Sequence, residues 1–242
     1  MKTSNKILLG ILLISFGYLA CAQIALHTKY IRHSSTDAAK YKTFFYKSYT
    51  FSNIRKVGLA GLATCEVIFS DSIKLQVEKS SFNYVSFNVN GDSLVISGEH
   101  PAERSANYKL NRPTQNIKLY LPAKTAIYAF NSNVKVKGER KNSMALSYHF
   151  DLTESNLFTR YNYGADSLER YFDTLSVTAR KNSQVILFYN DHIKTLAAKL
   201  DHSLVNDYHA KIGRADLITD SSSVLVIAGA NMNKISAATI KK

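Results

Sequence analysis

The stretch that decides the fold is Lys181-Asn182-Ser183-Gln184-Val185-Ile186-Leu187-Phe188, in which a polar pair precedes a hydrophobic run. Similar stretches return elsewhere, and the aligned serines are Ser132, Ser155, Ser183, Ser203 and Ser222. The intervals between these serines are 23, 28, 20 and 19 residues. Two positions after each serine comes a hydrophobic residue: Val134, Leu157, Val185, Val205 or Val224. This period and content are typical of a solenoid built from β coils of about 20 residues.

The polar pair has a physical role as a corner between two strands. Asn and Asp tolerate the backbone angles of a sharp turn, and their short side chains hydrogen-bond to the nearby backbone. Serine is small enough to stack on the serine of the next coil, so the five serines are predicted to form a structural corner ladder. Successive coils would lie about 4.8 Å apart, and alternate apolar residues would fill the interior. Asp207 occupies a position where the pattern requires an apolar residue, so either its strand is short or bent, or the register is misassigned.

Residues 51–122 predict a smaller region of short strands before the coils. Val85–Val89 and Ser93–Ser97 flank Asn90-Gly91-Asp92, a strong hairpin signal because Asn-Gly supplies the positive φ of the turn. Cys65–Phe69 and Ile73–Val77 flank a second tight turn, Ser70-Asp71-Ser72. Ile117–Leu121 is a further strand, closed by Pro122. We therefore expect an all-β chain with an N-terminal β-hairpin region at 51–122 and serine-marked repeats at 123–242.

The first residues have the pattern of an export signal. Lys2 and Lys6 precede an almost wholly apolar run, which predicts one N-terminal helix, and Ala20-Cys21-Ala22 allows a cut before Gln23. An uncut membrane anchor at residues 1–22 is the second alternative, and a lipid-anchored Cys21 is the third. Residues 23–50 form a polar, basic spacer. Each alternative places the rest of the chain outside the cytoplasm, in the periplasm, at the outer membrane or at the cell surface.

The chain carries a formal net charge of +13. Such a charge favours attraction to acidic polysaccharide or an acidic envelope surface, although scattered lysines also serve solubility alone. Nucleic acid is not an expected partner, because the sequence has no zinc spacing, RNP-type strand or helix-turn-helix pattern. Contact with a membrane is expected only through an uncleaved N-terminal segment.

The order of these strands and repeats resembles that of a known family. Phe51–Leu59 followed by Cys65–Phe69 is similar to the opening strands of bacterial proteins with the auto-transporter adhesin head GIN domain. Val85–Gly98 resembles the next hairpin of that family, and Ile117–Pro122 followed by the serine-marked repeats continues the order. The resemblance covers roughly residues 51–235. It implies a right-handed β-helix-like solenoid in an exported envelope protein, and it brings no catalytic residues or cofactors to transfer.

The sequence offers little chemistry. Cys65 lies in a strand pattern and is expected to be a buried apolar side chain rather than a nucleophile. Asp201-His202-Ser203 contains the residue types of a catalytic triad, but adjacent residues cannot form that relay. His202 and Asp207 would point to opposite faces of a strand, so no metal site is expected. A polysaccharide-active enzyme would need paired acids, and Asp166 with Glu169 is the nearest candidate.

We therefore expect no enzyme, no cofactor and no metal, and a role in adhesion or surface and carbohydrate interaction. The candidate contact residues are Arg160, Tyr161 and Tyr163, which place aromatic rings beside a cation in the insertion of the 28-residue interval. A structural or signalling-associated envelope domain is the alternative, because it needs no binding pocket.

Overall fold

The computed structural model describes residues 21, 23–24, 45–98, 116–122, 124–137, 147–159 and 170–239. The chain divides into two units, Met1–Tyr46 and Lys47–Lys242, and nearly all described residues belong to the second. Apart from Cys21, the predicted leader therefore lies outside the described residues, as does most of the predicted spacer. Among the described residues, no helix combines the length and the apolar character that a membrane span requires.

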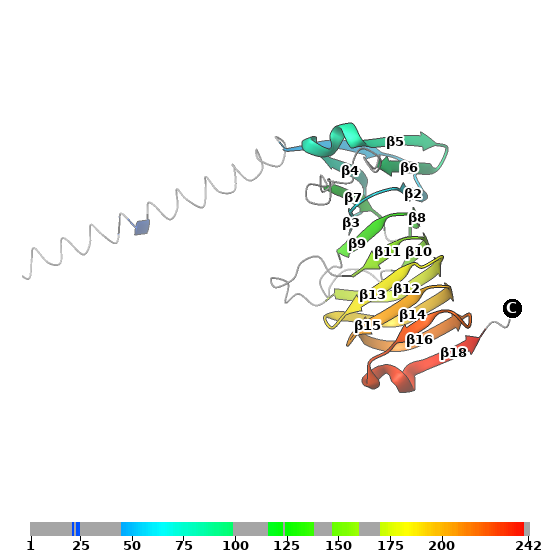
Figure 1. Cartoon of the computed structure of the whole chain (residues 1–242). Coiled ribbons are helices and arrows are strands. Elements are labelled where there is room, and N and C mark those ends of the chain that lie inside the picture. Colours follow the sequence, from blue (N-terminus) through cyan, green and yellow to red (C-terminus); the bar gives the residue numbers. More distant parts are fainter. Residues whose placement is uncertain are drawn as a thin grey trace, which may run out of the picture. The chain divides into compact units, whose positions relative to one another are not determined.

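The second unit is mostly β structure and contains two nine-stranded sheets (Figure 1). Sheet A contains, in spatial order, β1 (Tyr46–Phe51), β4 (Ile73–Glu78), β7 (Ile117–Leu121), β3 (Cys65–Phe69), β9 (Asn133–Lys137), β11 (Asn156–Phe158), β13 (Gln184–Phe188), β15 (Leu204–Tyr208) and β17 (Val224–Val226). Sheet B contains β18 (Ile235–Thr239), β16 (Lys211–Thr219), β14 (Asp191–Asp201), β12 (Arg170–Arg180), β10 (Ser147–Thr153), β8 (Ala126–Phe130), β2 (Lys56–Ala60), β6 (Ser93–Gly98) and β5 (Val85–Asn90). The all-β prediction is confirmed, although β1 begins inside the predicted spacer.

From β8 onward the chain moves to the other sheet after every strand. In sheet B, β8, β10, β12, β14, β16 and β18 pair in parallel in that order. In sheet A, β9, β11, β13, β15 and β17 do the same. Each circuit of the chain therefore adds one strand to each sheet, beside the strands of the previous circuit (Figure 1). An interior strand can thus pair its backbone groups on both sides.

The N-terminal region confirms the predicted hairpin and shows which strands the second predicted turn joins. β5 and β6 pair antiparallel, and Gly91 in their turn has a φ of 60°. In contrast, β3 and β4 do not pair with each other, because β7 lies between them. β7 is parallel to β3 and antiparallel to β4. β3 pairs in parallel with β9 on one side and with β7 on the other. The turn at residues 70–72 therefore joins two strands, β3 and β4, that are not neighbours in the sheet.

The core lies between the two sheets and is filled by the alternate residues of each strand. In β13, Val185 and Leu187 are fully buried, whereas Gln184 faces outward. Val134, Leu157, Val185 and Val205 occupy equivalent positions in successive circuits, and all four are fully buried. Since the side-chain period of a strand is two residues, this constant register keeps one set of apolar residues inside along the described circuits.

The corners before the sheet A strands require unusual backbone angles. The residue directly before each of four marked serines has a positive φ: Asn131 at 45°, Glu154 at 52°, Asn182 at 61° and His202 at 51°. Asparagine and histidine occur in this left-handed region more often than most residues, whereas Glu154 carries a steric cost there. The corner geometry therefore recurs even where the residue type is unfavourable for it.

The serine hydroxyls connect one corner to the next. Ser132 N donates to Ser155 Oγ at 3.1 Å, and Ser155 N donates to Ser183 Oγ at 3.1 Å. Each hydroxyl in turn donates to a backbone oxygen of its own corner, as Ser155 Oγ does to Thr153 O at 2.8 Å. Leu62 N extends this series to the N-terminal region by donating to Ser132 Oγ at 3.0 Å. The serine hydroxyl thus satisfies a buried N–H of the neighbouring circuit in addition to being small.

At the last corner the equivalent residue is Ser223 rather than Ser222. Ser203 N donates to Ser223 Oγ at 3.2 Å, whereas Ser222 Oγ donates to the carboxylate of Asp220. The pairing of Leu204 with Val224 sets this register. Because a shift of one residue exchanges the two faces of a strand, Val224 and Val226 are exposed and Leu225 turns toward the core.

Asp207 has a role that the sequence analysis did not anticipate. It lies opposite Leu187 in a five-residue strand, so neither a short strand nor a misassigned register explains it. Its buried carboxylate accepts hydrogen bonds from Ala228 N at 2.7 Å and from Asn231 Nδ2 at 2.8 Å. Asn231 belongs to the 3₁₀ helix η3 (Gly229–Lys234), and another 3₁₀ helix, η1 (Lys79–Tyr84), follows β4. Asp207 therefore fastens η3 to the last circuits of the core.

The corner ladder predicts a stability difference between two serine variants. Ser155→Ala leaves the buried Ser132 N–H without its partner, which should lower the free energy of unfolding by about 1–3 kcal/mol. Ser221→Ala, at an exposed position of the last corner, should change it by less than about 0.5 kcal/mol. Urea denaturation of both variants measures the difference. Equal midpoints would contradict a stabilising role for the ladder.

Candidate functional site

The predicted contact residues Arg160, Tyr161 and Tyr163 lie outside the described residues, as do Asp166 and Glu169. The structure does describe the two ends of the insertion that contains them. Thr159 is the last described residue before it, and Arg170 is the first residue of β12 after it. Both side chains contact the same carboxylate, that of Asp191 at the start of β14.

Asp191 is fully buried and has three kinds of hydrogen-bond donor around it. Arg170 Nε donates to Oδ1 at 2.7 Å, Phe188 N donates to Oδ2 at 2.7 Å, and the Thr159 hydroxyl also donates to Oδ2. Burial raises the pKa of Asp191 above its usual range, and the nearby Arg170 guanidinium and the hydrogen bonds act in the opposite direction. The Arg170 side chain is only 8% exposed. This buried ion pair joins the two described ends of the insertion, Thr159 and Arg170, to the start of β14.

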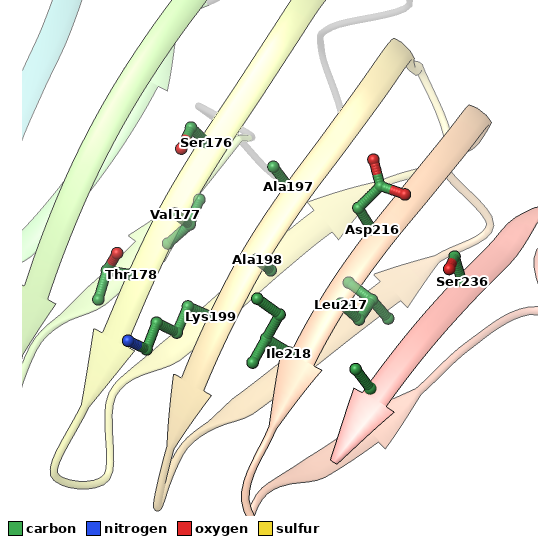
Figure 2. A pocket seen from close by; sticks show the side chains of 11 residues that line it. Ser176, Val177, Thr178, Ala197, Ala198, Lys199, Asp216, Leu217, Ile218 and Ser236 are labelled. Carbon is green, nitrogen blue, oxygen red and sulfur yellow. The ribbon is translucent and has the colours of Figure 1, made fainter. Parts of the chain in front are cut away.

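An open groove lies on the outer face of sheet B, across β12, β14, β16 and β18 (Figure 2). Its volume is about 260 Å³. Two rows of outward residues run across the paired strands. The first row is Ser176, Ala197, Asp216 and Ser236, and the second is Thr178, Lys199, Ile218 and Ala238. Apart from Asp216, the side chains of the first row are small, and Lys199 and Ile218 lie in the neighbouring row (Figure 2).

The polar groups of this groove are hydroxyls, one ammonium and one carboxylate. Asp216 accepts a hydrogen bond from Arg214 Nε at 3.0 Å, so its charge is compensated by a residue just outside the groove. Lys199 has no carboxylate among the groove residues other than Asp216. The groove can therefore offer hydrogen bonds and a positive charge to a ligand that lies along it.

Each sheet also carries a pair of stacked rings. Tyr171 and His192, neighbours on β12 and β14, stack with ring centroids 4.5 Å apart at an interplanar angle of 17°. On sheet A, Phe188 and Tyr208 stack at 5.8 Å and 14°. Such outward rings provide flat apolar area next to polar groups.

The corner after β14 brings together residues that the sequence analysis considered only in part. His202 Nδ1 lies 2.8 Å from Asp201 Oδ1 and 3.2 Å from Asp220 Oδ2. Ser203 Oγ donates to the backbone oxygen of Asp201, so the three adjacent residues do not form a triad. Asp220 was missed because it comes from the next circuit. The sequence did contain a sign of this proximity: Asp220 follows Asp201 by 19 residues, the same interval that separates Ser222 from Ser203.

Cys65 is completely buried in β3. Burial, with the neighbouring charge of Glu66 as a smaller cause, raises the pKa of its thiol to about 12. Since the thiolate is the reactive form, this residue cannot act as a nucleophile near neutral pH. The prediction of an apolar structural role agrees with this environment.

No protein-family model matches the chain, and no curated protein matches it. Some solved structures are similar to it. A "putative lipid binding protein" from Parabacteroides distasonis ATCC 8503 is 12% identical, covers 79% of this chain and 74% of its own, and has a TM-score of 0.43. A "putative adhesin" from Parabacteroides merdae ATCC 43184 is 12% identical over 80% of this chain and 74% of its own, with a TM-score of 0.40. A "putative adhesin" from Bacteroides fragilis NCTC 9343 is 10% identical over 81% and 93%, with a TM-score of 0.40. At these values the similarity carries no inference about what this chain binds.

The environment of Cys65 predicts that its thiol is unreactive in the folded protein. In a Cys21→Ser variant, which leaves Cys65 as the remaining cysteine, an aromatic disulfide reagent at pH 8 should release no colour until denaturant is added. Full release should then follow. Reaction of the folded variant at the rate of a free peptide thiol would contradict the buried position.

The buried pair of Arg170 and Asp191 predicts a large loss of stability when one partner is removed. Arg170→Met should lower the free energy of unfolding by about 3–5 kcal/mol, because it leaves a buried carboxylate without its cation. The pKa of Asp191 in the folded state then lies further above its unfolded value. The folded state binds a proton more tightly, so the loss is full at neutral pH and shrinks as the pH falls through that raised pKa.

The matched control is Arg180→Met. Arg180 also pairs with an aspartate, at 2.6 Å from Asp151, but its side chain is 45% exposed. Its replacement should cost less than about 1 kcal/mol and should show little dependence on pH. Denaturant titrations at several pH values compare the two variants, and equal losses at neutral pH would show that Arg170 is not an internal anchor.

Proposed function

We propose that the chain is an exported, non-enzymatic protein of the cell envelope that binds polysaccharide at a surface. In this proposal its β part is a right-handed β-helix-like solenoid of the auto-transporter adhesin head GIN type. The alternation of the chain between two sheets and the parallel pairing of successive circuits support a solenoid. The formal net charge of +13 supports an acidic binding partner.

The observation that carries this function is the groove on the outer face of sheet B. It runs across the strands, along the direction in which the circuits stack, so equivalent groups recur at the strand spacing of about 4.8 Å. A linear polymer lying in it would meet Ser176, Ala197, Asp216 and Ser236 in succession. Lys199 adds a positive charge beside that path, which suits an acidic polysaccharide.

The groove lacks the groups that an enzyme acting on polysaccharide needs. Glycoside hydrolysis uses two carboxyl groups about 5–10 Å apart on either side of the scissile bond. Asp216 is the single acid among the residues that line this groove, and Arg214 compensates it. Binding without turnover is therefore the function that this surface supports.

The test compares two lysines of the same strand. Lys199 lies in the groove, whereas Lys194 is 77% exposed outside it and pairs with Asp173 at 3.0 Å. A glycan array on the purified protein identifies the bound polymer, and titration then measures affinity. Lys199→Gln should weaken binding of an acidic polysaccharide roughly threefold to tenfold, the size expected for loss of one partly exposed ionic contact. Lys194→Gln should leave it unchanged.

The predicted insertion provides a second arm of the same experiment. If Arg160, Tyr161 and Tyr163 are the contact residues instead, their replacement by Ala weakens binding while Lys199→Gln does not, and the melting temperature stays constant. No binding to any acidic or neutral glycan on the array would overturn the proposal and favour a structural or signalling-associated envelope domain.

A further inference from the structure

We propose that Asp201, His202 and Asp220 form a binding site for a divalent transition-metal ion such as Zn²⁺. The site lies at the corner that follows β14. Asp201 is the last residue of β14, and Asp220 directly follows β16 in the next circuit. The pairing of Leu200 with Thr219 places these two aspartates at equivalent positions of neighbouring circuits, with His202 beside them.

The three donor atoms already converge. One side-chain nitrogen or oxygen from each residue lies within 4.8 Å of the other two. His202 Nδ1 is 2.8 Å from Asp201 Oδ1 and 3.2 Å from Asp220 Oδ2. Ligands bound tetrahedrally to Zn²⁺ at about 2.0–2.1 Å lie about 3.3 Å apart, so both distances from His202 to the carboxylates are within about half an ångström of that spacing.

The position of Asp220 is fixed by contacts outside the donor set. Its side chain is 5% exposed, and its carboxylate accepts hydrogen bonds from the hydroxyls of Ser222 and Ser223. The backbone N–H of His202 donates to Asp220 Oδ1 at 3.2 Å. These partners can hold the carboxylate in place in the way that outer-shell groups orient metal ligands.

The other side of the site is open. The side chains of Asp201 and His202 are 43% and 55% exposed, so a metal ion can enter and water can complete its coordination. A donor set of one imidazole nitrogen and two carboxylate oxygens suits Zn²⁺ and similar ions, whereas Ca²⁺ prefers an all-oxygen set. An exposed site with three protein ligands fits moderate affinity.

The donor set is more specific than a group of acids. One circuit earlier, the residue at the position equivalent to Asp201 is Arg180, which forms an ordinary ion pair with Asp151. Among the described residues, a histidine nitrogen lies close to two carboxylates only at the neighbouring corners that follow β14 and β16. The inference rests on this juxtaposition and is independent of the polysaccharide groove.

The experiment is a titration of the metal-free full-length protein with Zn²⁺ at pH 7.5, followed by calorimetry and by the NMR signals of the histidine ring nitrogens. We expect one Zn²⁺ per chain and a shift of the Nδ1 signal of His202. His202→Gly removes the imidazole while favouring the positive φ of 51° at this position, and it should abolish binding without lowering the melting temperature. Ser222→Ala, which removes a partner of Asp220, should weaken binding roughly tenfold.

His209→Gly is the matched control. His209 is another exposed histidine with a positive φ, of 57°, but it lies outside this cluster. This variant should bind Zn²⁺ as the unaltered chain does. The proposal is overturned if the unaltered protein binds no Zn²⁺ at millimolar concentration, if both histidine variants lose binding equally, or if the His202 ring signals do not respond to the metal.

Discussion

The structure depends on backbone pairing between successive circuits in a constant register. Each circuit places one strand on each sheet. The corner between the two strands must therefore stack directly on the corner of the previous circuit. Serine hydroxyls help to meet this constraint, since those of Ser155 and Ser183 each accept an N–H from the neighbouring corner and donate to a carbonyl oxygen of their own corner. Without them, the buried N–H groups at the sharpest bends would have no partner. The residue before each of four marked serines adopts a positive φ, as Asn131, Glu154, Asn182 and His202 do.

The same constraint explains where charge can enter the interior. Asp191 and Asp207 occupy inward positions in strands that are otherwise apolar there, and both are fully satisfied by donors from neighbouring segments. Asp191 ties the two ends of the insertion to the start of β14, and Asp207 ties η3 to the last circuits. Each acid therefore marks a place where the repeating path is interrupted or ends. Because a buried charge without partners would be costly, these sites specify one arrangement of the chain there.

A repeating fold also brings outward residues into rows, and the candidate sites follow from that. Residues spaced by one circuit become neighbours about 4.8 Å apart, whatever their separation in the chain. The groove on sheet B arises because the row from Ser176 to Ser236 contains small residues while the adjacent row contains Lys199 and Ile218. The corner cluster arises in the same way, from Asp201 and Asp220 in consecutive circuits. Neither site requires a special loop.

Much of this architecture could be predicted from the sequence, because its physical basis is local. The alternation in Gln184–Phe188 determined which side chains face the core, and Asn90-Gly91-Asp92 determined the hairpin of β5 and β6. The class of the fold followed from such patterns. Only the tertiary structure decided the pairing of β7 between β3 and β4, the choice of Ser223 over Ser222, and the meeting of Thr159 and Arg170 on Asp191. These features depend on the lengths of corners and insertions, and a difference of one residue in a corner exchanges inside for outside along the whole strand that follows.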